Sequence, residues 1–306
     1  NNTALGHQTM ISNTTGANNV AVGKDALSAN TTGGSNTSVG HRSLLANTTG
    51  AELTALGNHA LHNNTTGDYN NATGVYALYN NTTASNNTAN GYRALFANTT
   101  GAGNTATGMR ALQANTTGTS NVSFGKDSLY TNTTGGNNTA IGTNALESNT
   151  TGPSNTAVGK SALQANTTGH SNTAFGLSSL ALNTTGGENV AVGINALGAN
   201  TTGSTNVGFG KDSLASCTTG SGNTTLGYRA GEHSTGLTTG SASILLGAYC
   251  HSSSVSSAYA TGIGYNINAA AGYTTIGEST NDIRAAHGNV TWSTVSDERY
   301  KKDITT

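Results

Sequence analysis

The sequence predicts an all-β protein built as a repetitive parallel β-roll, or β-solenoid, with 17 residues in each coil. A unit of pattern N-T-T-G-x-x-N-(T/V)-(A/S)-Φ-G-x-x-(A/S)-L-x-x, where Φ is usually apolar, recurs from Asn13 to His233 without insertion or deletion. Small residues dominate, with 42 Gly against 1 Pro, and 4 Phe and 1 Trp are too few to fill ordinary globular cores. Self-similarity at one fixed period is typical of stacked coils that pack only against their neighbours.

The first element of each unit is a short strand. In Asn19-Val20-Ala21-Val22-Gly23 the residue types alternate as they do in a strand. We expect the Φ residues, such as Val22, to form an apolar ladder along the stack. The residue before Φ is nearly always Ala or Ser, which indicates a crowded environment, either the coil interior or a partner subunit.

A glycine follows the strand in every copy. Because only glycine adopts positive φ freely, we predict a structural corner at these positions. Examples are Gly23, Gly40, Gly57, Gly125 and Gly193.

The second half of the unit carries a second apolar row, which includes Leu27, Leu44 and Leu61. We predict a second short strand there, so that each coil contains two strands. Asn-Thr-Thr-Gly then turns the chain back, with Asn and Gly providing turn geometry and the Thr pair suited to an extended segment or to hydroxyl-to-backbone bonding. At the usual strand spacing of about 4.8 Å, thirteen coils would stack to about 60 Å.

The second Asn of the unit, as in Asn19, Asn36 and Asn70, is expected to stack in register. Side-chain amides placed in this way can form hydrogen bonds along the stack. Leu53 interrupts this row once, and Ala84 once replaces the turn glycine.

Three segments follow from the pattern. Residues 1–233 form the repeat shaft, residues 234–295 a transition or neck of irregular coils, and residues 296–306 a charged end. Thr261-Gly262-Ile263-Gly264 is one such irregular coil. The chain begins within a coil, at Asn2-Thr3-Ala4-Leu5-Gly6, so we expect further sequence upstream of Asn1.

Composition argues against several classes of function. The net charge of −1 gives no electrostatic footprint for nucleic acid, and no run of 18 apolar residues predicts a membrane span. The invariant positions carry almost no Asp or Glu, so a glycosidase site is not expected. Cys217 and Cys250 are too few for a disulfide framework, and we interpret Cys217 as a small buried thiol. No cofactor is expected.

Tyr69, Tyr76, Tyr79 and Tyr92 lie close together in the sequence, in coils where the consensus also changes. They are either a patch that stacks against a host-surface glycan or simple variation at free positions.

Histidines and charged pairs are weaker candidates. His59 and His62 are three residues apart, but no carboxylate or cysteine completes a metal set nearby, so we expect a solvated loop and no metal. Lys24-Asp25 and Lys126-Asp127 occupy the two free positions after the corner and are expected to be solvated.

The repeats resemble known fibrous proteins. Units such as Asn189-Val190-Ala191-Val192-Gly193 resemble the head repeats of trimeric autotransporter adhesins, and the 17-residue unit with N-T-T-G resembles repeats in bacteriophage tail fibres. This similarity covers about residues 2–233. It implies left-handed parallel β-rolls, three of which pack around one axis as a homotrimer.

The C-terminal end carries a second resemblance. Ser296-Asp297-Glu298-Arg299-Tyr300-Lys301 and the following residues fit S-D-x-R-x-K-x-x-I, which resembles the start of the intramolecular chaperone domain of phage tail spikes, endosialidases and tail fibres. That resemblance implies self-cleavage between Ser296 and Asp297, with Ser296 and Lys301 as a catalytic dyad. Ten residues follow Ser296, so the body of that domain is absent from this sequence. An ordinary charged tail is the alternative.

We therefore expect an extracellular structural fibre or adhesin segment, part of a trimeric phage tail fibre that attaches to a host-surface glycan or receptor. A bacterial surface fibre or trimeric adhesin is the alternative. It would not be an enzyme, apart from self-cleavage. An ice-binding β-solenoid is a further alternative, which the adjacent Thr pair disfavours because alternation sends the two side chains to opposite faces.

Overall fold

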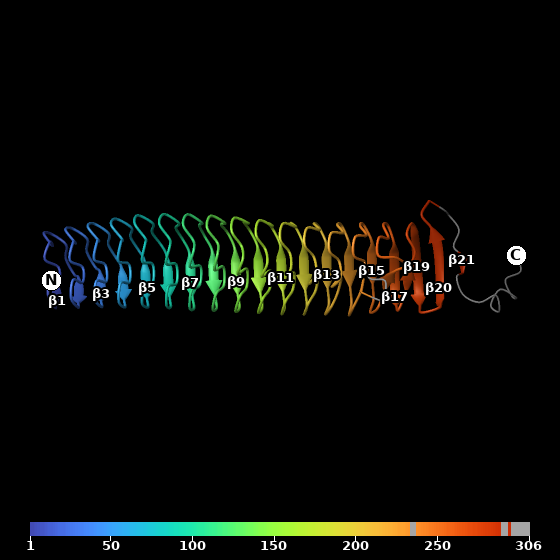
Figure 1. Cartoon of the computed structure of the whole chain (residues 1–306), viewed down its shortest axis with the longest axis horizontal. Helices are drawn as coiled ribbons and strands as arrows, with labels where there is room; N and C mark the ends of the chain where they lie inside the picture. The colour runs from blue at the N-terminus through green and yellow to red at the C-terminus, as the bar shows by residue number, and fades with distance from the viewer. Residues whose placement is uncertain (233–236, 289–292, 295–306) are drawn as a thin grey trace, which may run out of the picture. The chain divides into compact units, whose positions relative to one another are not determined.

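The structure, a computed structural model, describes residues 1–232, 237–288 and 293–294. It is all-β, with no helix among those residues, which confirms the predicted fold class. Two compact units are present, Asn1–Thr168 and Gly169–Thr306. Each unit is a β-solenoid in which strands follow one another from turn to turn (Figure 1).

In the first unit a strand of three residues recurs every 17 residues. The strands are β1 (Thr3–Leu5), β2 (Val20–Val22), β3 (Thr37–Val39), β4 (Thr54–Leu56), β5 (Asn71–Thr73), β6 (Thr88–Asn90), β7 (Thr105–Thr107), β8 (Val122–Phe124), β9 (Thr139–Ile141) and β10 (Thr156–Val158). Neighbours pair in parallel, and Ala21 of β2 lies beside Ser38 of β3. This register of 17 residues places equivalent positions of successive turns in straight rows.

The second unit continues with the same kind of strand and then changes. Its strands are β11 (Thr173–Phe175), β12 (Val190–Val192), β13 (Val207–Phe209), β14 (Thr224–Leu226), β15 (Ile244–Leu246), β16 (His251–Ser252), β17 (Thr261–Tyr265), β18 (Asn268–Ala269), β19 (Tyr273–Glu278), β20 (Asn281–Ala286) and β21 (Ser293–Thr294). The series from β11 to β15, then β17 and β19, pairs in parallel. The repeat pattern does not predict the antiparallel strand β20 beside β19.

The prediction of a second strand in each coil is wrong. Each 17-residue turn contains one strand, and the segment with the second apolar row is a series of tight turns. Leu27, Leu44 and Leu61 have φ values of 52°, 51° and 51°, in the left-handed region. A strand requires strongly negative φ, so these leucines reach the core from turn geometry instead.

The predicted glycine corner is confirmed. Gly23, Gly40, Gly57, Gly125 and Gly193 have φ between 131° and 138°. A Cβ on Gly57 would lie 2.6 Å from the carbonyl oxygen of Gly74 in the next turn. Glycine is therefore required by both conformation and space.

The core of each turn is built from small residues and one leucine. The central residue of the strand is fully buried, as at Ala55 in the first unit and Ala191 in the second. The small side chains thus face the coil interior rather than a partner. The leucine row is also fully buried, including Leu27, Leu95 and Leu197.

Two rows of buried asparagines join the turns. In the predicted row, the backbone N–H of Asn36 donates to Oδ1 of Asn19 at 2.9 Å. Further along, Nδ2 of Asn121 donates to Oδ1 of Asn104 at 3.2 Å, which confirms hydrogen bonding between side-chain amides along the stack. Leu53 keeps this contact through its own N–H, which donates to Asn36 Oδ1 at 3.0 Å. The first Asn of N-T-T-G, for which only turn geometry was predicted, forms the more direct ladder. There, Nδ2 of Asn47 donates to Oδ1 of Asn30 at 2.8 Å.

The Thr and Gly of N-T-T-G also contact the next turn. Oγ1 of Thr31 donates to the carbonyl oxygen of Thr48 at 3.0 Å, as predicted for hydroxyl-to-backbone bonding. The turn glycine does not have left-handed φ. It is favoured because a Cβ on Gly33 would lie 2.3 Å from the carbonyl oxygen of Gly50.

Candidate interaction surfaces

The outer face of the strands carries an uncovered apolar row in each unit. The predicted ladder of Φ residues forms, but it lies outside the core because its side chains alternate with the buried central residue. Phe124 and Ile141 in the first unit are 57% and 41% exposed, and Phe209 in the second is 51% exposed. A regular row of half-exposed large apolar side chains is unusual for a surface that stays in water.

Three successive turns of the first unit interrupt this row. Strands β5, β6 and β7 carry polar residues at both outward positions. These residues are Asn71, Thr73, Thr88, Asn90, Thr105 and Thr107. The strand face is therefore polar over these turns and apolar on the strands before and after them.

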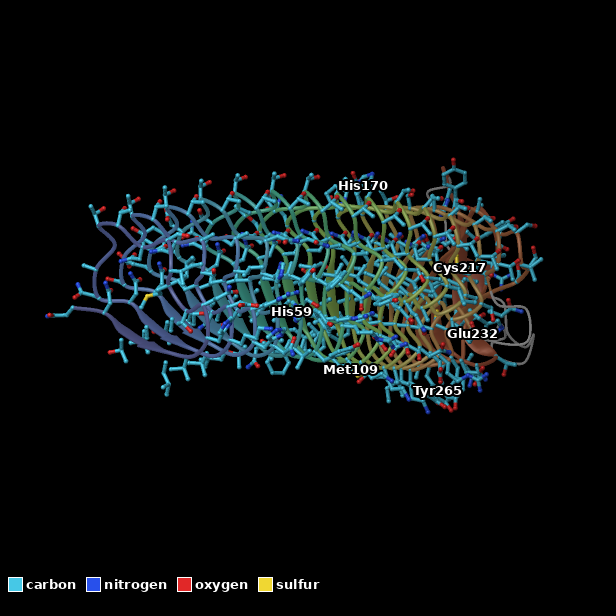
Figure 2. The ribbon with its side chains drawn as sticks, turned by 60° about the vertical axis from the view of Figure 1, so that its left-hand side comes forward. His59, Met109, His170, Cys217, Glu232 and Tyr265 are labelled. Carbon is cyan, nitrogen blue, oxygen red and sulfur yellow. The ribbon has the colours of Figure 1, made fainter. Side chains whose placement is uncertain are left out.

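The same part of the first unit carries a group of rings just beyond the glycine corner. We define the aromatic ladder as His59, His62, Tyr76, Tyr79 and Phe96, all half-buried. Tyr79 stacks on Phe96 with ring centroids 5.3 Å apart and an interplanar angle of 7°. His62 stacks on Tyr79 at 4.9 Å, and His59 on Tyr76 at 5.2 Å. Each of these stacks joins residues 17 apart, so the coil register builds the ladder. His59 is labelled in Figure 2.

The predicted tyrosine patch is brought together only in part. Tyr76 and Tyr79 are neighbours in the ladder, with centroids 5.6 Å apart. Tyr92 joins the group through Arg93, whose guanidinium carbon lies 5.3 Å from the Tyr92 ring centroid. Tyr69 lies elsewhere in the turn, just after N-T-T-G, and has no ring contact within the described part of the chain. His59 and His62, which were expected in a solvated loop, keep part of their surface exposed and also stack in the ladder.

The carboxylates beside the corner are also not solvated, contrary to expectation. Asp25 and Asp127 are 6% and 5% exposed. Asp25 pairs with Arg42 of the next turn at 3.3 Å, and Asp127 pairs with Arg110 of the preceding turn at 2.7 Å. The register that aligns position with position places these opposite charges one turn apart. Lys24 and Lys126 are exposed.

Arg93 occupies the same row as Arg42 and Arg110 but differs from them. Within the described residues no carboxylate forms an ion pair with it, and its buried Nε has no hydrogen-bond partner. Its guanidinium lies over three rings, those of Tyr76, Tyr92 and Phe96, at 5.9, 5.3 and 5.3 Å. Arg93 is thus held by aromatic contacts, and its charge is not neutralised by an ion pair.

The pKa of His59 reflects the positive charge around the ladder. Burial lowers the pKa of His59, and the neighbouring His62, His41 and Arg42 lower it further. Every charged neighbour that acts on this pKa is therefore a base. No group of three or more His, Cys, Asp or Glu that could hold a metal is present among the described residues.

Both cysteines are buried thiols, as expected for Cys217 (Figure 2). Burial raises the pKa of Cys217 to about 11 and that of Cys250 to about 12. Cys217 occupies the position of the ladder asparagine and donates weakly from Sγ to the carbonyl oxygen of Gly220, at 3.7 Å.

A second aromatic group, for which the sequence alone gave no prediction, lies in the second unit. The rings of Tyr228 and Tyr249 are 5.3 Å apart, and those of Tyr249 and Tyr265 are 6.0 Å apart. Arg229 lies 6.0 Å from the Tyr249 ring. These tyrosines lie one or two residues after the strand glycine, so counting from that glycine would have placed them near one another.

The remaining predicted site lies outside the described residues. Ser296, Asp297 and Lys301, proposed for self-cleavage, belong to this part. The described residues contain no apolar helix of membrane-spanning length. Comparison with protein-family models, curated proteins and solved structures finds no match for this chain.

Proposed function

We propose that this chain is a structural segment of an extracellular fibre in which three copies pack through their strand faces. The uncovered Φ row carries this proposal. The fibre would be a phage tail fibre that attaches to a host surface, and each copy would be a left-handed coil. The chain itself provides stiffness and a surface, and no chemistry is required of it.

The energetics favour burial of this face. Covering a half-exposed Val, Leu or Phe contributes about 1 kcal/mol, and the row offers such a side chain in most turns. A second copy of the chain is the occupant that fits best, because its row has the same 17-residue spacing and can meet the first in register. Another protein would need the same period to cover the row.

Native mass tests the association directly. We expect the full chain to give three times its single-chain mass in native mass spectrometry and in light scattering at micromolar concentration. A monomer would overturn the trimer and, with it, the role of the Φ row. A bacterial surface fibre would also give a trimer, and the virion or cell-surface location of the natural protein distinguishes the two.

Ice binding is a second candidate because one outward strand position forms a row of threonines. Thr37, Thr54, Thr88 and Thr105 occupy this row, which is separate from the Thr pair of N-T-T-G. Phe124 on the same face makes a flat array difficult. A thermal-hysteresis assay that shows no activity would exclude this candidate.

Self-cleavage remains a prediction. A longer chain that includes the natural downstream sequence should be cut between Ser296 and Asp297. Cleavage that is unaffected by Ser296→Ala or Lys301→Ala would contradict the proposed dyad.

A further inference from the structure

The aromatic ladder and the polar strand face overlap in two turns of the first unit, those that contain β5 and β6. Tyr76 follows β5 by three residues, and Tyr92 and Arg93 follow β6 directly after its glycine. Two of the three turns that lose the apolar row, those of β5 and β6, thus carry ladder rings, and the turn of β6 also carries the unpaired Arg93. Two independent departures from the repeat in these two turns indicate a local site.

The ladder is ordered before any ligand arrives. Its rings hold one another at the spacing of the turns, so a ligand would not have to immobilise them, and binding would avoid that entropy cost. The inner ring faces are covered by neighbouring rings. A ligand therefore meets ring edges and the exposed Tyr92 ring, which is 44% exposed.

Arg93 gives the site its charge preference. A guanidinium presents five N–H donors in a planar fork, and a carboxylate can accept two of them at once. In the neighbouring turns Arg42 and Arg110 already use this capacity on Asp25 and Asp127. Arg93 has no such partner among the described residues and is only half-buried, so its charge still lacks the anionic partner that Arg42 and Arg110 have.

The polar strand face supplies the other contacts. Asn90 and Thr88 of β6 are exposed and present amide and hydroxyl groups that both donate and accept hydrogen bonds. Sugar hydroxyls form hydrogen bonds with neutral groups of this kind. Together with the aromatic rings and the one cation, these groups give the usual composition of a small binding site for a polar ligand.

We propose that this surface binds a carbohydrate that carries carboxylate groups. A nucleic acid is less suited, because a phosphate backbone is normally met by several cations along its path, whereas here one arginine is unpaired. The carboxylate would come from a sialic acid or a uronic acid. This inference deepens the proposed attachment role and rests on it, but it does not depend on association of three copies.

Matched acidic and neutral sugars test the proposal on the full chain. Calorimetry would compare 3′-sialyllactose with lactose, and a hyaluronan hexasaccharide with its carboxyl-reduced form. We expect one acidic sugar to bind at least about tenfold more tightly than its neutral partner. The pair that shows the difference identifies the source of the carboxylate. No preference in either pair would overturn the proposal.

Variants locate the site. Arg93→Gln should remove the preference for the acidic sugar, and Arg93→Lys should retain part of it because the charge remains. Arg229→Gln, which removes a cation from above Tyr249 in the second unit, is the matched control and should bind as the unaltered chain does. Equal loss in the control, or none in Arg93→Gln, would refute the assignment. Native mass, measured in parallel, shows whether the fibre proposal fails separately.

Discussion

The buried leucine of each turn combines two requirements at one residue. Leu95 is fully buried and has φ of 52°. A β-branched side chain is strongly disfavoured at such φ, whereas leucine branches one carbon further out. This explains why the row keeps leucine while the Φ row, which lies on a strand, accepts Val, Ile, Leu and Phe.

Leu95→Ile should therefore be more damaging than its conserved volume suggests. We expect a loss of about 1–3 kcal/mol in the free energy of unfolding from backbone strain, compared with less than about 1.5 kcal/mol for Leu95→Met. Guanidinium unfolding of both variants measures the difference. Leu56→Ile, on a strand where Ile141 occupies the equivalent position, is the control and should change little. Similar midpoints for Leu95→Ile and Leu56→Ile would contradict the explanation.

Because the two thiols are buried, we expect the free energy of unfolding to depend on pH in the alkaline range. Burial raises the pKa of Cys217 from 9.0 to about 11 in the folded chain. Between these values the unfolded state loses the thiol proton while the folded state keeps it, so the stabilising contribution is complete below pH 9 and falls as pH rises towards about 11. Cys217→Ser should flatten this fall in the unfolding midpoint. An unchanged pH dependence would show that other groups cause it.

Within one turn, hydroxyl pairs replace alanine pairs in the core. Ser38 and Ser43 are buried with their Oγ atoms 2.6 Å apart, and Ser123 and Ser128 repeat this arrangement at 2.5 Å. Most turns hold two alanines at these positions, such as Ala55 and Ala60. One turn holds a mixed pair, Ala174 and Ser179, and there Oγ of Ser179 donates to the carbonyl oxygen of Gly176 at 3.0 Å. The element therefore accepts two alanines, two serines, or one serine whose hydroxyl bonds to the backbone.

The direct contact between the Ser38 and Ser43 hydroxyls predicts non-additive substitutions. Ser38→Ala and Ser43→Ala should each lower the free energy of unfolding by about 1 kcal/mol, because each weakens a buried hydrogen-bonded pair. The double variant should lose clearly less than the sum, since it restores the alanine pair of other turns. A double-mutant cycle by guanidinium unfolding measures the coupling. Strict additivity would mean that the two hydroxyls act independently.

How far the sequence predicts these elements depends on what the repeat encodes. The exact period defines the rows, so the strand at Val20–Val22, the corner at Gly23 and the amide row of Asn36 were all predictable. The second strand was predicted wrongly because an apolar row at Leu27 looks the same whether strands or left-handed turns produce it. The sign of φ is a local backbone property that apolar spacing does not report.

The candidate site shows a related limit. Closeness in the sequence groups Tyr69 with Tyr76, although the two tyrosines occupy different rows of the solenoid. Counting in steps of 17 instead joins His62, Tyr79 and Phe96, which are the rings that stack. The same count places Tyr76 and Arg110, neither of them acidic, beside Arg93 in its row, so the lack of an ion pair at Arg93 was also predictable.

For the molecule as a whole, the proposed assembly concerns the apolar face that a single copy exposes to solvent. The cores of the turns are filled by small side chains and leucine, so the large apolar residues that remain lie outside, as at Ile141. If three copies cover this row, stability becomes dependent on protein concentration, because association and folding are then linked. A chain that is stable as a monomer would show no such dependence.

A single charge on the row should separate assembly from folding. Ile141 is 41% exposed on the outer face of β9, so Ile141→Lys leaves the core of its turn intact but places a cation at the proposed interface. We expect weaker association by at least about tenfold, because an unpaired charge would have to be desolvated. Thr143→Lys adds the same charge beyond the corner, in a row that already holds Lys126 and Lys160, and should leave association unchanged. Sedimentation over a concentration series distinguishes them, with circular dichroism as the check on folding. Equal behaviour of the two variants would show that the Φ row is not where the copies meet.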